Sequence, residues 1–172
     1  MDNIFKRFKN TVSGSQYQAS DEVLNVSPYK APEFVGLQNW INSDVLSLAD
    51  LKGTVVLVDI WTFGCINCVR TLPHVQKWYE TYKDQGFTVI GVHSPEFEAE
   101  KVPENVEKAV EFRKLTYPVA MDNEMKTWRA YKNNYWPAQY LVDKQGMVRR
   151  VHFGEGEYAE AEQAIRMLLA ES

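Results

Sequence analysis

The segment from residue 55 to residue 68 constrains the fold more than any other part of the chain. It reads VVLVDIWTFGCINC, and its first half is an apolar run rich in β-branched residues. Such runs are typical of a strand buried on both faces of a sheet. After the turn at Gly64, apolar residues recur at spacings of three and four, as on one face of a helix; they are Val69, Leu72, Val75, Tyr79 and Tyr82. The sequence therefore predicts a buried strand that leads directly into an amphipathic helix.

The two cysteines of the chain, Cys65 and Cys68, lie where this strand passes into the helix. Free backbone N–H groups and the positive end of the helix dipole stabilise a thiolate there. Cys65, at the helix start, is expected to be the more exposed thiol and to attack a substrate disulfide. Cys68, one turn deeper, is then expected to resolve the mixed disulfide. We predict dithiol–disulfide redox chemistry.

Other interpretations of a Cys-x-x-Cys pair fit the sequence less well. A zinc site needs more ligands, and the chain has no further cysteine and three scattered histidines. Covalent haem attachment needs a histidine at position 69, which is valine. A structural disulfide across so short a loop adds little stability, although it leaves open a non-catalytic binding module. We predict no metal and no cofactor.

Asp59 is an acidic residue inside the otherwise apolar strand. A carboxyl group is costly to bury, and burial raises its pKa. We expect Asp59 to accept the proton that Cys68 loses when it attacks. The alternative is that Asp59 faces solvent at the end of the strand.

The rest of the pattern predicts a mixed sheet in a single domain. A second buried strand follows the helix, and the resulting βαβ unit requires it to run parallel to the first. Short runs at 34–41 and 45–48, joined by Asn and Ser, predict an N-terminal β-hairpin. Further elements are expected in this order: strand 87–92, helix 103–115, strand 117–121, helix 124–131, strands 138–142 and 147–153, and helix 158–170. The predicted fold class is α/β, with a central mixed β-sheet and helices on both faces.

Residues 1–28 differ from the rest of the chain in composition. They are rich in Asn, Ser, Gln and Lys without a sustained period, so we expect a flexible arm or linker ahead of a domain at 29–172. The basic residues near the start are followed by no apolar stretch typical of a secretory signal. Either the chain is cytoplasmic, or a signal or anchor lies upstream of it, and the residues alone leave both cases open. The net charge of −4, with both signs interspersed, argues against a nucleic-acid partner.

The spacing of several residues resembles the thioredoxin superfamily. Asp59 and Trp61 precede Cys65-x-x-Cys68, and Pro73 follows eight residues after Cys65. In that family an acid assists the buried cysteine, and a cis-proline lies beside the disulfide. The resemblance implies that Pro137, after Trp136, is this cis-proline.

The resemblance is closer to the TlpA-like branch, and closest to the thioredoxin-like domain of DipZ-type cytochrome c biogenesis proteins. It covers about residues 28–169 and is carried by the segments 61–73, 91–97, 135–138 and 153–158. It implies a thioredoxin-like enzyme that reduces or exchanges protein disulfides outside the cytoplasm, in the periplasm or tethered to a membrane. The expected partners are a disulfide-containing protein and a membrane thiol reductant, and the chain is expected to be a monomer.

Aromatic and neighbouring side chains around the cysteines are expected to bind substrate peptide; they are Trp61, Phe63, Ile66, Asn67 and Trp136. Trp61 fits a core position equally well. The acidic run that includes Glu100 is expected to be a solvated face. A peroxiredoxin-like thiol peroxidase is an alternative, because Thr62 lies three residues before Cys65. The proline that a peroxidase carries seven residues before the cysteine is Val58 here.

Overall fold

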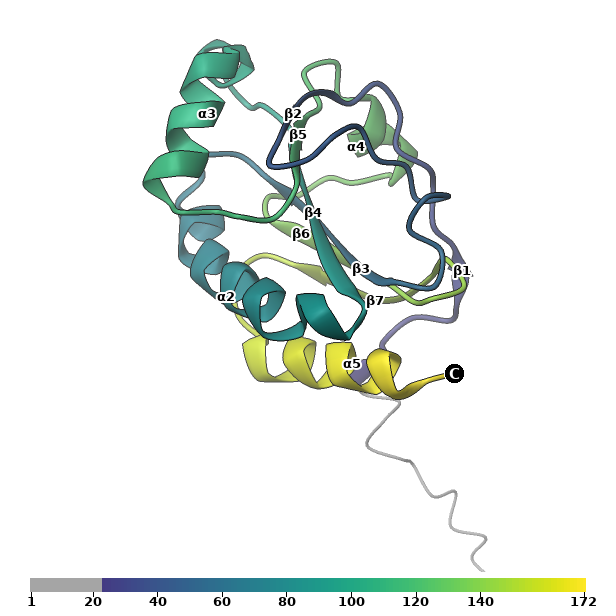
Figure 1. Cartoon of the computed structure of the whole chain (residues 1–172). Helices are drawn as coiled ribbons and strands as arrows, with labels where there is room; N and C mark the ends of the chain where they lie inside the picture. The colour runs from purple at the N-terminus through teal and green to yellow at the C-terminus, as the bar shows by residue number, and fades with distance from the viewer. Residues whose placement is uncertain (1–22) are drawn as a thin grey trace, which may run out of the picture.

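In the computed structural model of the chain, which describes residues 23–172, seven strands form one mixed sheet (Figure 1). Their order across the sheet is β1-β7-β6-β3-β4-β5-β2. Strands β3, β4 and β5 run parallel to one another, and the remaining pairs are antiparallel. The strands are β1 (Tyr29–Lys30), β2 (Gln38–Ile41), β3 (Val55–Trp61), β4 (Phe87–His93), β5 (Val119–Met121), β6 (Ala138–Val142) and β7 (Met147–Phe153). The predicted mixed sheet is confirmed.

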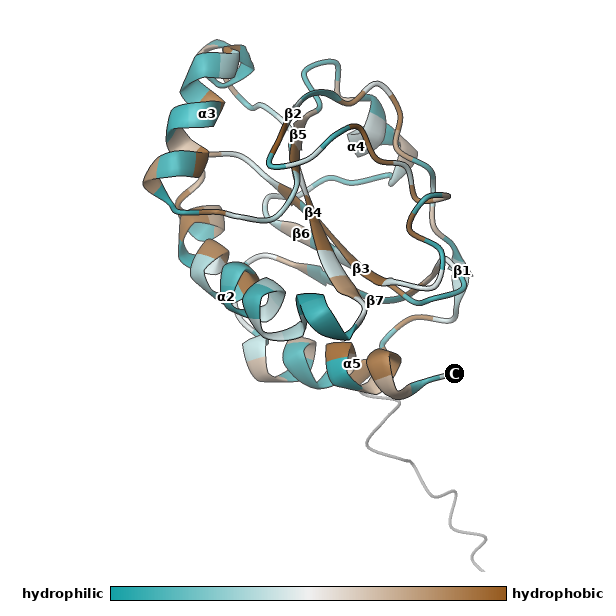
Figure 2. Cartoon of the chain, viewed as in Figure 1, coloured by the Kyte–Doolittle hydropathy of each residue, from teal (hydrophilic) through white to brown (hydrophobic). Residues whose placement is uncertain are grey.

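The helices cover the sheet unevenly. One face is covered by α2, α3 and α5, and the other by the short α4 together with the chain between residues 31 and 51 (Figures 1 and 2). Two short 3₁₀ turns also occur within residues 23–172. The helices are α2 (Ile66–Tyr82), α3 (Pro103–Phe112), α4 (Lys126–Ala130) and α5 (Tyr158–Ala170), and the 3₁₀ turns are η1 (Lys83–Gln85) and η2 (Glu98–Lys101). None of the helices between residues 23 and 172 is long and apolar enough to cross a bilayer.

Strand β3 is the centre of the molecule, and all seven of its residues are buried. Successive side chains of a strand point to opposite faces, so β3 contributes to two separate cores. Leu57 and Trp61 pack beneath α2 and α5, whereas Val58 and Ile60 pack on the opposite face. The predicted doubly buried strand is therefore confirmed, and it carries the chain straight into α2.

The predicted N-terminal hairpin is wrong. Strands β1 and β2 lie at opposite edges of the sheet, where β1 pairs with β7 and β2 pairs with β5. Asn42, at a backbone φ of 66°, donates side-chain hydrogen bonds to the carbonyl oxygens of Leu115 and Tyr117 at 2.9 and 3.0 Å. These bonds tie the end of β2 to the chain before β5. Residues 45–48 form no strand, because their leucines pack on the second core instead.

Most of the predicted arm, residues 1–22, lies outside the described residues. Residues 23–28 are part of the packed domain. Val23 is buried in the first core and accepts a hydrogen bond from Arg150 at 2.8 Å. The side chain of Asn25 exchanges two hydrogen bonds with the backbone of Val151, both 2.9 Å long. Within the described residues, positions 23–28 therefore belong to the packed unit and not to the predicted arm.

Candidate active site

The two cysteines occupy the start of α2 in different environments. Cys65 is the N-cap residue, and its Sγ accepts a hydrogen bond from the backbone N–H of Cys68 at 3.3 Å. Cys65 is partly exposed, whereas Cys68 is fully buried, and both thiols are free. Burial, together with the hydrogen bond and charge of Cys65, raises the pKa of the Cys68 thiol. An accessible thiol thus lies beside a buried one that needs an acceptor for its proton.

Asp59 lies on the cysteine-bearing side of β3 and is buried, which excludes the solvent-facing alternative. Only 1% of its surface is exposed. Its Oδ1 accepts a hydrogen bond from Gln139 Nε2 at 3.4 Å, and within the described residues Oδ2 has no partner. Burial raises the pKa of Asp59 to about 7, against the opposing effect of the Gln139 bond. The charge of Asp59 also contributes to the raised pKa of Cys68. The carboxyl group can therefore gain or lose a proton near neutral pH.

The surroundings of Asp59 are closed by aromatic rings. Gly91 faces Asp59 on β4, and a Cβ at Gly91 would lie 3.0 Å from the Tyr117 ring and 3.2 Å from Trp61 Nε1. The absence of that Cβ lets both rings pack close to the acid. Trp61 is fully buried, so the predicted direct contact with substrate is not available to it. Its indole, as a core residue, helps to exclude water from Asp59.

The loop before Cys65 is held by a buried polar cluster. The backbone N–H of Phe63 donates to His93 Nε2 at 3.2 Å, and the Thr62 hydroxyl lies 3.4 Å from the same atom. Burial lowers the pKa of His93 to about 4, which keeps the ring neutral and able to accept at Nε2. The ring stacks on Phe63 and meets Trp61 edge-on. His93 thus holds the loop at Thr62 and Phe63 in place against the end of β4.

Glu100 is the site residue that the sequence analysis missed. It was expected on a solvated face, but its exposed fraction is 2%. One oxygen, Oε2, accepts hydrogen bonds from the N–H groups of Glu96 and Phe97 at 2.6 and 3.1 Å. Burial acts to raise the pKa of Glu100. These two hydrogen bonds and one from Thr62 outweigh that effect, so the pKa of Glu100 lies below its usual value. The sequence offers little indication that Glu100 is buried, because Glu96 and Glu98 precede it in the same acidic run and nothing in the spacing distinguishes the three.

Replacing Gly64 with alanine is expected to distort this loop. A Cβ at Gly64 would overlap Glu100 Oε1, and Glu100 cannot move away without losing its hydrogen bonds from the backbone of Glu96 and Phe97, just before η2. We expect a loss of about 1–3 kcal/mol in the free energy of unfolding. Urea unfolding of Gly64→Ala measures it, with Asp84→Ala, at an exposed position in η1, as the control. A stability equal to that of the parent would show that the Glu100 contact does not restrain the loop.

Several predicted substrate-binding residues lie on the surface around Cys65. Ile66 is exposed, and Phe63, Asn67 and Trp136 are partly exposed. Trp136 Nε1 donates to the carbonyl oxygen of Ser94 at 2.9 Å, which joins the loop before β6 to the end of β4. The peptide bond between Trp136 and Pro137 is cis, as the family resemblance predicted.

Comparisons with known proteins agree with this geometry. Residues 28–151 match the AhpC/TSA family. Protein DipZ of Mycobacterium tuberculosis (strain CDC 1551 / Oshkosh) is 49% identical over 142 residues, or 81% of this chain. The chain spans only 20% of the length of DipZ. Thiol-disulfide oxidoreductase YkuV of Bacillus subtilis (strain 168) is 28% identical over 141 residues, which cover 82% of this chain and 95% of YkuV.

A solved structure shows the same fold. The thioredoxin-like superfamily protein SPOA0173 superimposes with a TM-score of 0.77 at 30% identity, over 83% of this chain and 97% of that protein. The match along residues 28–151, the shared fold and the paired cysteines lead to one conclusion. The chain belongs to the AhpC/TSA family and has a thioredoxin-like fold.

Proposed function

We propose that this chain reduces or exchanges disulfide bonds of other proteins, with Cys65 as the attacking thiol and Cys68 as the resolving thiol. One observation carries the proposal: a partly exposed sulfur caps α2, and a fully buried thiol follows one turn later. A disulfide substrate can reach only the first sulfur. The second can react only with a bond formed at the first.

The reaction then proceeds in two exchanges. The Cys65 thiolate attacks one sulfur of the substrate disulfide, forms a mixed disulfide and expels the other sulfur as a thiolate. Cys68 gives its proton to Asp59, and its thiolate attacks Cys65 Sγ. The Cys65–Cys68 disulfide forms, and the second substrate sulfur leaves as a thiolate. The cysteine pair is oxidised, and the substrate disulfide is reduced.

The surface around Cys65 suits a polypeptide substrate. Ile66 is an exposed apolar side chain directly after Cys65, and the partly exposed Phe63 and Trp136 pack against the same core cluster as Cys65. Exposed apolar groups gathered around a reactive atom favour contact with another chain. Asn67 adds a polar group at the start of α2. Pro137 precedes β6, next to this surface.

The cellular setting is also a proposal. The resemblance to the TlpA-like branch favours work outside the cytoplasm, in the periplasm or at a membrane, as a monomer. A membrane thiol reductant would then return electrons to the Cys65–Cys68 disulfide. A role in cytochrome c biogenesis follows from the similarity to DipZ-type proteins and belongs to this proposal.

The peroxidase alternative is less well supported. It needs the Thr62 hydroxyl beside the reactive sulfur, to hold a peroxide. Thr62 is fully buried, and its hydroxyl is directed to His93 and Glu100. Consumption of peroxide by the reduced protein at a rate above that of a free thiol would restore the alternative.

Insulin reduction by dithiothreitol tests the proposed function. The protein is expected to accelerate insulin precipitation, and Cys65→Ser is expected to reduce the rate to that of dithiothreitol alone, because no accessible thiol remains. Asp84→Asn, at an exposed position in η1 beyond the opposite end of α2 from the cysteines, serves as the control variant. Equal rates for the parent and Cys65→Ser would favour the non-catalytic binding module.

A further inference from the structure

Asp59 belongs to a polar row that crosses three neighbouring strands. Asp59 of β3 faces Gln139 of β6, and Gln139 faces His152 of β7. Because these residues are paired across the sheet, their side chains share one face. Adjacent strands lie about 4.8 Å apart, so roughly 10 Å separates the backbones of Asp59 and His152. The row leads from the centre of the sheet toward its edge.

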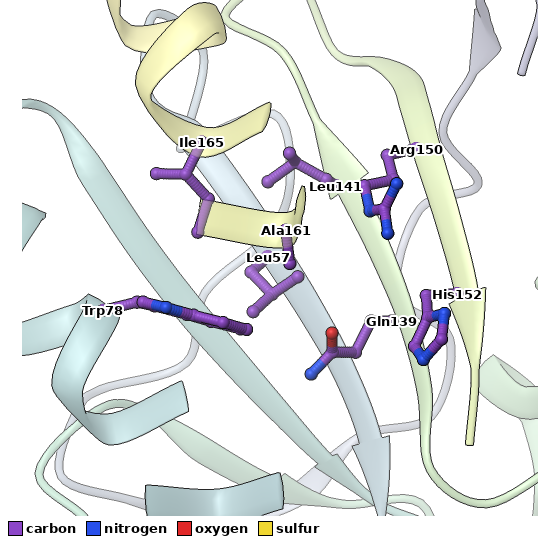
Figure 3. Close-up of a pocket in the computed structure, with 8 residues that line it drawn as sticks. All are labelled: Leu57, Trp78, Gln139, Leu141, Arg150, His152, Ala161 and Ile165. Atoms are coloured by element: carbon purple, nitrogen blue, oxygen red, sulfur yellow. The ribbon is translucent and has the colours of Figure 1, made fainter. Parts of the chain in front are cut away.

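A small cavity lies along this row (Figure 3). Gln139 and His152 point into it from neighbouring strands, and Arg150 lies beside them. The space accommodates about one water molecule, and its polar lining supplies hydrogen-bond partners for one. The remaining walls are apolar and come from β3, α2, β6 and α5: Leu57, Trp78, Leu141, Ala161 and Ile165.

The two ring nitrogens of His152 face different environments. Nδ1 lies 3.2 Å from Glu157 Oε2, and the Glu157 side chain is 53% exposed. Nε2 is buried and has no hydrogen-bond partner among residues 23–172. Imidazole can take up a proton at one nitrogen and release one from the other near neutral pH. His152 therefore has one proton-exchange site directed inward and one directed to the solvent.

We propose that His152 carries protons between Asp59 and the solvent, through a water molecule in the cavity beside Gln139. The proton that Asp59 takes from Cys68 passes to this water when the Gln139 amide moves aside. It reaches His152 at Nε2, while a proton leaves Nδ1 toward Glu157. Asp59 is thereby returned to its ionised form for the next cycle. This inference rests on the proposed function, because only a resolving Cys68 releases the proton.

Three other titratable groups lie along this path within residues 23–172: Cys68, Tyr117 and Arg150. Cys68 of α2 supplies the proton, and Tyr117 faces Asp59 with a pKa raised by burial and by the charge of that acid. Arg150 is held by Glu157 at 2.6 Å and by the carbonyl oxygen of Val23. Burial keeps the proton on Tyr117, and the guanidinium of Arg150 is occupied by these two bonds, which leaves His152, with one nitrogen buried at the cavity and the other against Glu157.

The test separates the two exchanges with Ellman's reagent. Reduced protein releases one thionitrobenzoate when Cys65 attacks and a second when Cys68 resolves the mixed disulfide. Reduced protein held at pH 5.5, where Asp59 is protonated, is mixed into weak buffer at pH 8, so that Asp59 must lose its proton before it can accept that of Cys68. His152→Gln and His152→Ala are then expected to slow the second release roughly tenfold, less than loss of a group that takes the proton directly. The first release is expected to stay unchanged. Added imidazole is expected to restore the alanine variant, which has space for it, and not the glutamine variant.

The glutamine variant retains a hydrogen-bonding side chain of similar size, so a purely structural role of His152 predicts a normal second release. That result would overturn the relay, as would an alanine variant that imidazole does not restore. His74→Gln is the matched control, because His74 stacks on Tyr158 away from this cavity, and both of its phases are expected to match the parent. A parent protein that never releases a second thionitrobenzoate would instead refute Cys68 as the resolving thiol, and with it the proposed function.

Discussion

Asp59→Asn is expected to be more stable than the parent protein and slower in catalysis. Burial raises the pKa of Asp59 to about 7, whereas the unfolded carboxyl ionises near 3.8. The folded state therefore binds more protons than the unfolded state between these values, and the free energy of unfolding falls as the pH rises through this window. Above pH 7 the ionised, buried acid costs about 4 kcal/mol. The amide removes that cost, and urea unfolding at pH 8 is expected to show most of the gain.

The pH dependence distinguishes this effect from a general improvement in packing. The gain is expected to shrink toward zero as the pH falls to about 4, where Asp59 is protonated in both states. His93 makes the free energy of unfolding depend on pH in the opposite direction. Because burial lowers the pKa of His93 from 6.5 to about 4, the unfolded state binds more protons between these values, and the free energy of unfolding falls as the pH falls below 6.5. Without Asp59, the free energy of unfolding is therefore expected to rise with pH between 4 and 6.5. A gain that is constant from pH 4 to pH 8 would contradict a raised pKa of Asp59.

The same variant is expected to resolve mixed disulfides more slowly, since an amide cannot accept the proton of Cys68. We expect a loss of about 10²-fold in the second exchange and little change in the first. Single-turnover measurements from pH 6 to pH 8 separate the two rates. Unchanged resolution kinetics across this range would show that another group accepts the proton.

Cys68→Ser is expected to accumulate stable mixed disulfides with substrate proteins, whereas Cys65→Ser is expected to accumulate none. The serine at position 68 leaves Cys65 partly exposed and able to attack, but removes the buried thiol that completes the reaction. Non-reducing gels of each variant after incubation with disulfide-bonded insulin measure the covalent product. Resolution is lost altogether, so this effect is the largest that we expect.

The matched variant at Cys65 is the control for these adducts. If Cys68 were the attacking thiol, adducts would form in Cys65→Ser instead, and equal trapping by both variants would overturn the assigned roles. Thermal unfolding of both variants checks that the serine at the buried position has not opened the core, since Cys68 packs against the residues beneath α2.

The segment from Val55 to Tyr82 could be predicted from the sequence because its signals are local. A β-branched run, a glycine and a period of three to four specify a strand, a turn and a helix within 28 residues. The residue-by-residue resemblance to a known family supplied the cis peptide before Pro137, which propensity alone does not favour. The strand-to-helix junction therefore placed both cysteines before any tertiary contact was known.

Tertiary structure alone decided what surrounds that junction. Strand β2 pairs with β5 across some eighty residues of sequence, so no local pattern could exclude a hairpin. Glu100 is buried because the segment that carries it, distant in sequence, packs against Gly64. Trp61 is buried because Gly91, which has no Cβ, leaves space for its ring. The row from Asp59 through Gln139 to His152 exists only in the register of three strands. Sequence determines which residues can do the chemistry, and long-range pairing determines which of them meet, because contact across a sheet carries no signature in the residues along either strand.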